Sequence, residues 1–340
     1  MSRIPGHRGL AVLCLLCLAA CDIHELPVGS SDVAVTLHLD FDRDLPPYTT
    51  VEYPRTRSEG EDALQVRYEL RLYKGVPGDF ERTPFYSDAY LTDYDGTLGG
   101  DVQFRFPARP GRYLAQLWVD FVSAEHGPFY DVDNFRDIRL SGEYTGEDER
   151  RDAYCLQAEL PLETLITAGS EYETTLTLGR PLARYRFVAT DKEEFLSFWA
   201  REIALMSGNS VKPTLSEREL DRYGVRVVYS QYLPDAFNMF TDRASDAGTG
   251  YSFQTNMHLR EDGKVDLAWD WVIVGPDEGL VVVSLEFYDP DGRYIATFRN
   301  FELPLMRGHV TTVEGKILTG GVDSGIAIDP TFDGEFNVYL

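Results

Sequence analysis

Apolar and polar residues alternate with a period of two along most of the chain. The stretches VAVTLHLDF (33–41) and LQVRYELRLY (64–73) show this alternation clearly. Because successive side chains of a β-strand point to opposite faces, the period predicts half-buried strands. The same alternation, or a short continuous apolar run, predicts further strands over residues 101–106, 112–122, 155–160, 173–178, 183–190, 225–229, 251–259, 265–274, 280–288, 294–303, 310–318 and 336–340.

One stretch has the period of a helix instead. Asp191 is typical of an N-cap residue, and Glu194 follows it at the spacing of a capping box. Apolar residues then recur at helical spacing, which predicts a helix over residues 192–206. A shorter helical turn is expected over residues 216–223.

Gly and Pro turns separate the predicted strands. The segment Gly179-Arg180-Pro181 interrupts the pattern near the middle of the chain, and the turn between Tyr288 and Tyr294 predicts a hairpin with Gly292 at positive φ. Many short strands with almost no helical periodicity indicate an all-β protein. We predict two tandem Greek-key β-sandwich domains, residues 32–180 and 181–340, with one short helix in the second.

The first 20 residues have the features of a secretory signal peptide. Arg3, His7 and Arg8 precede the apolar run from Leu10 to Ala20, and no acidic residue lies among them. A helix of that length covers about 16 Å of a hydrocarbon core about 30 Å thick, so a membrane-spanning helix is not expected.

The residues Leu18-Ala19-Ala20-Cys21 resemble the bacterial lipobox. That resemblance implies cleavage before Cys21, with fatty acyl chains such as palmitate on its thiol and amine and with residues 21–31 as a lipidated tether. Each buried CH₂ contributes about 0.8 kcal/mol, so several chains anchor a protein stably. The alternative is an ordinary signal peptide cut near Ala20, which leaves Cys21 unmodified.

The charge of the chain bears on its partners. The formal net charge is −24, and 43% of the residues are hydrophobic. Such a surface repels nucleic-acid phosphates and anionic lipid headgroups, so nucleic-acid binding is not expected and the lipid must hold the protein at a membrane.

No recognisable catalytic or metal-binding motif is present. Cys155 is the only cysteine after Cys21, and its alternating surroundings favour a buried structural thiol over a catalytic nucleophile. The pairs Asp93/Asp95, Asp131/Asp133 and Asp289/Asp291 have the spacing of calcium loops but lack the further ligands that an EF-hand needs, so they favour turns. We therefore expect no enzyme activity, no metal and no cofactor.

Aromatic residues leave one binding hypothesis open. Trp269 and Trp271 are two residues apart on a predicted strand, so they share one face and would stack on sugars if that face were exposed. Packing in the core is the alternative interpretation.

Several longer segments are similar to a family of Bacteroides-type surface lipoproteins of unknown function with fimbrillin-like architecture. These segments are CDIHELP, LHLDFDRDLP, GRYLAQLWVDF, FYDVDNFRDIRLSGEYTG, RPLARYRFVATDKEEF, YLPDAFNMFTD and GVDSGIAIDPTFDGEFNV. The resemblance implies transthyretin-like β-sandwiches, lipid anchoring in the outer membrane and exposure to the cell exterior. It also implies fimbrial or other surface protein subunits as partners, through donation of a strand to a neighbouring subunit. No catalytic residue is carried over.

The resemblance suggests roles for four further residues. Asp22 and Glu25 stand where related lipoproteins carry an acidic export signal, which is usually denser than this one. Arg55 and Arg57, in the predicted loop after the first strand, are candidates for the proteolytic processing seen in pilus subunits; a role as ordinary loop residues is the alternative.

The leading interpretation is therefore a non-enzymatic, lipid-anchored cell-surface protein, an anchor or accessory subunit of a fimbria-like assembly or an adhesin. The alternative is a glycan-binding surface lipoprotein that uses exposed aromatic residues.

Overall fold

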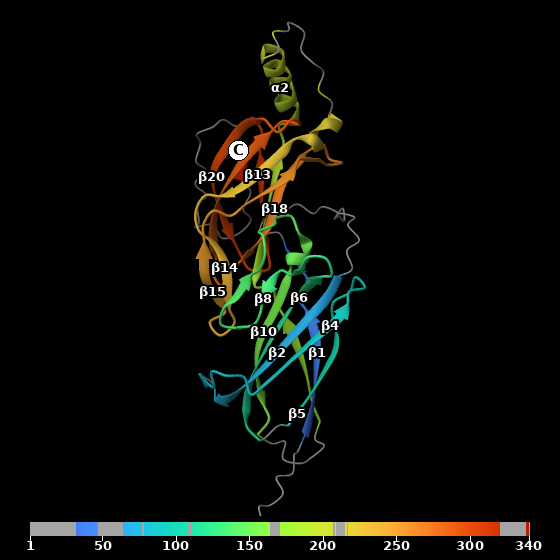
Figure 1. Cartoon of the computed structure of the whole chain (residues 1–340), viewed down its shortest axis with the longest axis vertical. Helices are drawn as coiled ribbons and strands as arrows, with labels where there is room; N and C mark the ends of the chain where they lie inside the picture. Colours follow the sequence, from blue (N-terminus) through green and yellow to red (C-terminus); the bar gives the residue numbers. More distant parts are fainter. Residues whose placement is uncertain are drawn as a thin grey trace, which may run out of the picture.

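The computed structural model describes residues 32–46, 64–76, 78–107, 110–163, 171–206, 208, 215, 217–319 and 338–339. The predicted signal peptide and tether lie outside the described residues. Figure 1 shows an elongated molecule in which strands from the first half of the chain occupy the lower part and those from the second half the upper part.

The first half of the chain forms two facing sheets. The smaller has the order β11-β1-β5, in which β1 runs parallel to β11 and antiparallel to β5. The larger has the order β10-β6-β2-β3, with β4 paired to β2 and β7 paired to β6. The strand bounds are β1 Asp32–Phe41, β2 Leu64–Val76, β3 Asp79–Phe80, β4 Tyr86–Asp93, β5 Gly100–Pro107, β6 Arg112–Ser123, β7 Gly127–Pro128, β10 Ala153–Pro161 and β11 Glu171–Leu178.

Alternate residues of these strands fill the space between the two sheets. Leu37 of β1, Leu70 of β2 and Leu117 of β6 are each at most 1% exposed and belong to one apolar cluster. The alternation of apolar and polar residues predicted half-buried strands, and these strands are half-buried, because every second side chain points into a shared core.

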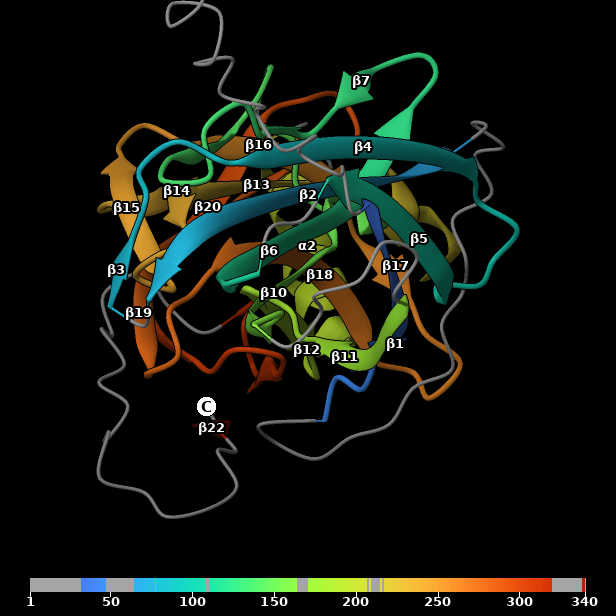
Figure 2. The same cartoon turned by 90° about the horizontal axis from the view of Figure 1, so that it is seen from below.

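The second half of the chain forms another pair of sheets. One has the order β17-β18-β12-β21-β22, and the other has the order β16-β13-β19-β20. Figure 2 views the molecule from below, with the strands of the first half in front of those of the second. The bounds are β12 Leu182–Ala189, β13 Gly224–Tyr229, β16 Ser252–Asn256, β17 His258–Leu259, β18 Val265–Ile273, β19 Gly279–Tyr288, β20 Tyr294–Leu305, β21 Val310–Gly315 and β22 Val338–Tyr339.

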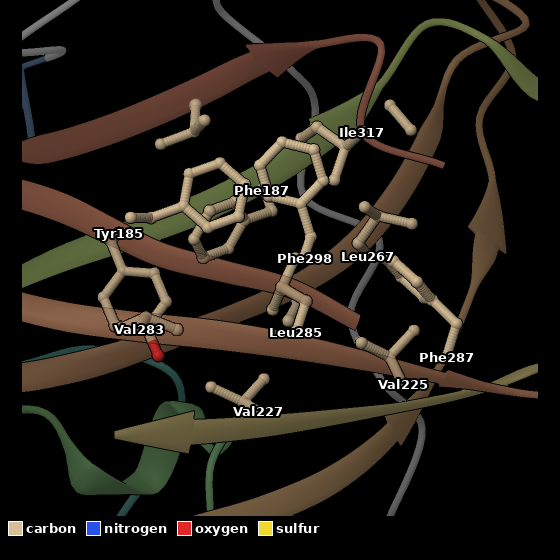
Figure 3. Close-up of a cluster of buried hydrophobic side chains, with 14 of the residues drawn as sticks. Tyr185, Phe187, Val225, Val227, Leu267, Val283, Leu285, Phe287, Phe298 and Ile317 are labelled. Atoms are coloured by element: carbon tan, nitrogen blue, oxygen red, sulfur yellow. The ribbon is translucent and has the colours of Figure 1, made fainter. Parts of the chain in front are cut away.

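The core of the second half is rich in aromatic residues. Phe187 of β12 lies 4.9 Å, ring centre to ring centre, from Phe301, which stacks on Phe298 at 4.4 Å. Figure 3 shows Phe187 and Phe298 converging with Leu285 and Leu267 between the sheets. The all-β sandwich prediction is confirmed, whereas the domain boundary near residue 180 stays a prediction.

The helix α2 spans Lys192–Met206, which are the predicted bounds. The predicted capping box does not form in the expected way. The Asp191 carboxylate accepts hydrogen bonds from the backbone N–H groups of Leu318 and Thr319 and from the Thr319 hydroxyl, while Glu194 pairs with Lys316. Asp191 therefore ties the start of the helix to the turn after β21. Two 3₁₀ helices, η1 and η2, span Glu149–Arg151 and Glu217–Arg222.

A fifth sheet, which the sequence did not predict, joins the two halves. Its order is β15-β14-β9-β8, with β8 Tyr130–Asp131, β9 Ile138–Leu140, β14 Leu233–Asn238 and β15 Arg243–Gly248. Strands β8 and β9 come from the first half of the chain, and β14 and β15 come from the second. An apolar cluster that includes Trp118, Phe237 and Trp271 packs at this junction.

Candidate functional site

The chain enters the fold at the end that lies away from the second half. Strand β1 runs toward the junction, because Arg180 Nη1 donates to the Asp44 carbonyl at 3.1 Å and Val310 N–H donates to the Pro46 carbonyl at 3.3 Å. The first residue of β1, Asp32, therefore lies at the opposite end of that strand, and β1 belongs to the lower part of the molecule in Figure 1.

Helix α2 lies at the other end of the molecule. Strand β12 starts at the junction, where Leu182 accepts a backbone hydrogen bond from Gly308, and runs outward to Ala189. Helix α2 follows after two intervening residues and lies at the upper end of the second half in Figure 1. The start of β1 and helix α2 thus lie at opposite ends of the molecule.

A cavity of about 380 Å³ opens at the α2 end. It lies between α2, η2 and the turn that joins β19 to β20. Apolar and charged side chains line it together: Trp199, Ile203, Leu215, Tyr223 and Pro290, with Glu219, Arg222, Asp289, Asp291 and Arg293. Its size falls within the range of about 300–1,000 Å³ typical of small-molecule pockets.

The β19–β20 turn presents its charged residues through a fixed hydrogen-bond pattern. The Asp289 Oδ1 atom accepts the backbone N–H groups of Asp291 and Arg293 at 2.9 and 2.8 Å. Gly292 has a φ of 77°, which confirms the predicted glycine position. Asp291 and Arg293 point outward, with side chains 71% exposed and only loosely paired at 3.9 Å.

The aromatic side of the cavity is well packed. Tyr223 is 2% exposed and Trp199 is 7% exposed, and the Tyr223 ring meets Phe195 of α2 edge-on at 5.6 Å. Burial raises the pKa of Tyr223 to about 12, and the nearby carboxylates of Glu219 and Asp289 add to the rise. The hydroxyl is therefore protonated at neutral pH and available as a donor.

Arg222 lies beside Tyr223 and is exposed. Within the part of the chain that the structure describes, its guanidinium makes no ion pair and no side-chain hydrogen bond. A guanidinium carries five N–H donors, and those of Arg222 have no acceptor among the described side chains.

A second cluster of polar side chains lies at the junction and is buried. The Asp270 carboxylate accepts from the hydroxyls of Tyr144 and Tyr229 at 2.5 and 2.6 Å and pairs with Arg151 at 2.6 Å. Burial raises the pKa of Asp270, and the charge of Arg151 acts against that rise. Because Arg151 and Asp270 are at most 4% exposed, a substrate does not reach this ion pair, and loss of either partner would leave an uncompensated buried charge at the junction.

The predicted site residues have different outcomes. Cys21, Asp22, Glu25, Arg55 and Arg57 lie outside the described residues, so their predicted roles stay predictions.

The two tryptophans of the predicted glycan platform lie on one strand face, ring centres 6.4 Å apart, but they do not form an open surface. Trp271 is 1% exposed and packs in the junction cluster, and the guanidinium of Arg184 covers the ring of Trp269 at 3.7 Å. Glycan binding therefore stays a prediction, without a platform at these two residues.

Cys155 is a free thiol that packs partly against the junction cluster. Burial raises the pKa of its thiol to about 12, so the nucleophilic thiolate is scarce at neutral pH.

The paired aspartates form turns. Asp131 accepts the N–H of Asp133, and Asp95 accepts the N–H and hydroxyl of Thr97. Among the described residues, no group of three or more His, Cys, Asp or Glu side chains is placed to hold a metal ion. Nor does that part of the chain contain a helix long and apolar enough to cross a membrane.

Residues 29–339 match a protein family described as "Family of unknown function (DUF6562)". The chain belongs to this family. This agrees with the sequence resemblance to a family without an assigned function. A search of curated proteins finds no match.

Several solved structures are similar to the family member described here. They include a candidate polysaccharide-binding protein (DUF1812) of Bacteroides thetaiotaomicron, with 10% identity over 78% of this chain and 80% of that chain and a TM-score of 0.41. A candidate adhesin of Bacteroides ovatus has 11% identity over 90% and 92%, with a TM-score of 0.40. The fimbrial anchor protein Mfa2 of Porphyromonas gingivalis has 11% identity over 79% and 82%, with a TM-score of 0.38. These proteins are of the kind that the sequence resemblance named, but TM-scores below 0.5 do not decide function.

The sequence did not reveal the cavity. It predicted α2, the short turn near residue 220 and the hairpin near residue 291 as separate elements. Their meeting depends on how the sheets stack, and no local motif marks it.

Proposed function

We propose that this chain is a non-enzymatic, lipid-anchored cell-surface protein that faces the cell exterior. Within that class, we propose an anchor or accessory subunit of a fimbria-like assembly, or an adhesin. The observation that carries the proposal is the position of the two ends of the molecule. The lipobox precedes β1 at one end, and the cavity beside α2 lies at the other.

The short length of the segment between Cys21 and β1 supports a position of the α2 end far from the membrane. Eleven peptide units join Cys21 to Asp32, so the tether spans at most about 40 Å. The lower end of the fold therefore stays near the membrane, while the length of both halves separates the α2 end from it (Figure 1). A surface-binding protein needs this order, because its contact region must reach past neighbouring molecules.

The absence of an enzyme function is proposed on chemical grounds. Cys155 has a raised thiol pKa, and the Asp270 carboxylate and its partner Arg151 are buried. Among the described residues, the charged groups of the open cavity include carboxylates and guanidiniums but no histidine.

The experiment compares Cys21→Ala with the matched control Cys155→Ala in intact cells. We expect the control to incorporate a clickable fatty acid, to fractionate with the outer membrane and to be labelled by a reagent that does not enter cells. The Cys21→Ala variant should lose both the fatty acid and the membrane association. Membrane association of Cys21→Ala at the level of the control would refute lipid anchoring.

A partner is sought in the same cells. Crosslinking followed by pull-down should recover fimbria-like or other surface subunits with the control, and fewer with the unanchored variant. Equal recovery from both would show that the anchor does not organise the assembly.

A further inference from the structure

We propose that the cavity between α2, η2 and the β19–β20 turn binds a neutral carbohydrate of one or two sugar rings. This inference rests on the proposed surface location, because exposure at the cell exterior brings the cavity into contact with glycans. It assigns a ligand class to a cavity that neither the sequence motifs nor the family description identifies.

The charges of the cavity select against charged ligands. Three carboxylates, from Glu219, Asp289 and Asp291, lie on the same lining as the guanidiniums of Arg222 and Arg293. An anion would meet the carboxylates and a cation would meet the guanidiniums, so each would face groups of its own sign. A neutral ligand avoids this repulsion.

The same groups also select against a purely apolar ligand. Displacing water from charged side chains without replacing their hydrogen bonds costs free energy. A ligand with many hydroxyls avoids that cost, since each hydroxyl donates to a carboxylate and accepts from a guanidinium. Neutral sugars have this property at nearly every carbon.

The apolar lining suits the other side of a sugar ring. Ile203 of α2, Leu215 and Pro290 supply most of the accessible apolar surface, because Trp199 and Tyr223 are only 7% and 2% exposed. Sugar rings carry C–H groups on their faces, which pack on such surfaces while the hydroxyls at the ring edge reach polar groups.

The cavity is built from supported elements. Tyr223 is fixed by its packing on Phe195 and by the backbone bond from Met257 N–H to the Tyr223 carbonyl. The Asp289 carboxylate holds the turn that carries Asp291 and Arg293. A ligand therefore meets groups whose positions need little ordering on binding.

The test uses the mature chain from residue 22 and two variants of the cavity, Asp291→Asn and Arg222→Ala. Both side chains are exposed and outside the packed core, so both variants should melt at the wild-type temperature. Asp277→Asn is a matched control, because Asp277 also follows a proline in a strand-connecting turn and is 70% exposed, against 71% for Asp291.

The probe is an array of immobilised neutral, sialylated and sulfated glycans, followed by calorimetry with the neutral glycan that is retained most strongly. We expect neutral glycans to bind, the two cavity variants to lose about tenfold or more in affinity, and Asp277→Asn to bind like wild type. Retention of no neutral glycan, retention of anionic glycans only, or unchanged binding by both cavity variants would overturn the assignment.

The two proposals fail separately. A purified chain that binds neutral glycans but stays inside the cell would refute the surface function alone. A chain that is exposed on cells but retains no neutral glycan would refute the carbohydrate assignment alone.

Discussion

Arg151 and Asp270 form an ion pair with Nη1 2.6 Å from Oδ1, although 119 residues separate them in the chain. Their side chains are 4% and 0% exposed. Arg151 belongs to η1 in the first half of the chain and Asp270 to β18 in the second, so the pair crosses the junction. Arg151 also donates to the Thr145 carbonyl at 2.6 Å and lies over the ring of Tyr144.

Removal of the Arg151 guanidinium should strongly lower the free energy of unfolding. In Arg151→Met, Asp270 keeps its tyrosine donors but becomes a buried charge without a partner, which costs about 3–5 kcal/mol. Urea unfolding measures the loss. The control Arg243→Met breaks the exposed Arg243–Asp277 pair and should cost no more than about 1 kcal/mol. Equal losses in the two variants would contradict a stabilising role for the junction pair.

The stability of the protein should depend on the protonation of Glu147. Burial raises the pKa of its carboxyl to about 7, although the Thr255 hydroxyl and the Trp269 N–H donate to it. The folded state thus binds this proton more tightly than the unfolded chain, whose glutamate pKa is about 4.3. The contribution is fully present below the unfolded pKa and is lost as the pH rises through about 7.

Glu147→Gln removes this titration and should stabilise the protein above pH 7 by about 1–2 kcal/mol. Unfolding free energies measured from about pH 5 to pH 8 should show a difference between variant and wild type that grows with pH. Glu143→Gln, at an exposed position in the same loop, is the control. A constant difference across this range would show that Glu147 does not titrate there.

The thiol of Cys155 should react slowly in the native protein. Its pKa of about 12 leaves a very small thiolate fraction at neutral pH, whereas an unfolded cysteine has a pKa of about 8.5. Iodoacetamide alkylation of a chain that starts after Cys21 should therefore be at least about a hundredfold faster in urea than in buffer. Similar rates would contradict the burial of the thiol.

Asp191 should position α2 through the turn after β21. In Asp191→Ala, the backbone N–H groups of Leu318 and Thr319 lose their acceptor, with an expected loss of about 2–3 kcal/mol. Hydrogen exchange at these two amides should accelerate. Glu193→Ala, an exposed change in the first turn, should cost less than about 1 kcal/mol. Unchanged exchange at residues 318 and 319 would favour simple helix capping.

Elements with an unbroken period could be predicted from the sequence, and irregular ones could not. Helix α2 and strands such as β1 and β2 carry a clear apolar pattern, because one face of each packs on a large core. Strand β14 contains Pro234 and two register shifts, which break the alternation. Strand β15 is mostly exposed and carries the polar sequence RASDAG, so nothing in it marks a buried face.

The location of Trp271 illustrates a different limit. Its spacing from Trp269 predicted a shared face, and the two rings do lie together. Which face is covered depends on β8, β9 and β14, which come from distant parts of the chain. A local pattern cannot distinguish a covered aromatic face from an open one. The charged lining of the cavity was missed for the same reason, because its three elements meet only in the folded protein.

The parallel pairing of β1 and β11 has a mechanical consequence. The ladder runs from Ala34 opposite Glu171 to Phe41 opposite Leu178. Tension between the membrane and the α2 end pulls on the start of β1 and on the end of β11. Because the two strands are parallel, these forces act along the strands in opposite directions, so the hydrogen bonds between them are sheared and bear the load together. We expect single-molecule pulling along this axis to give a higher rupture force than pulling that peels β1 from one end. Equal forces would show that the ladder does not carry the tension.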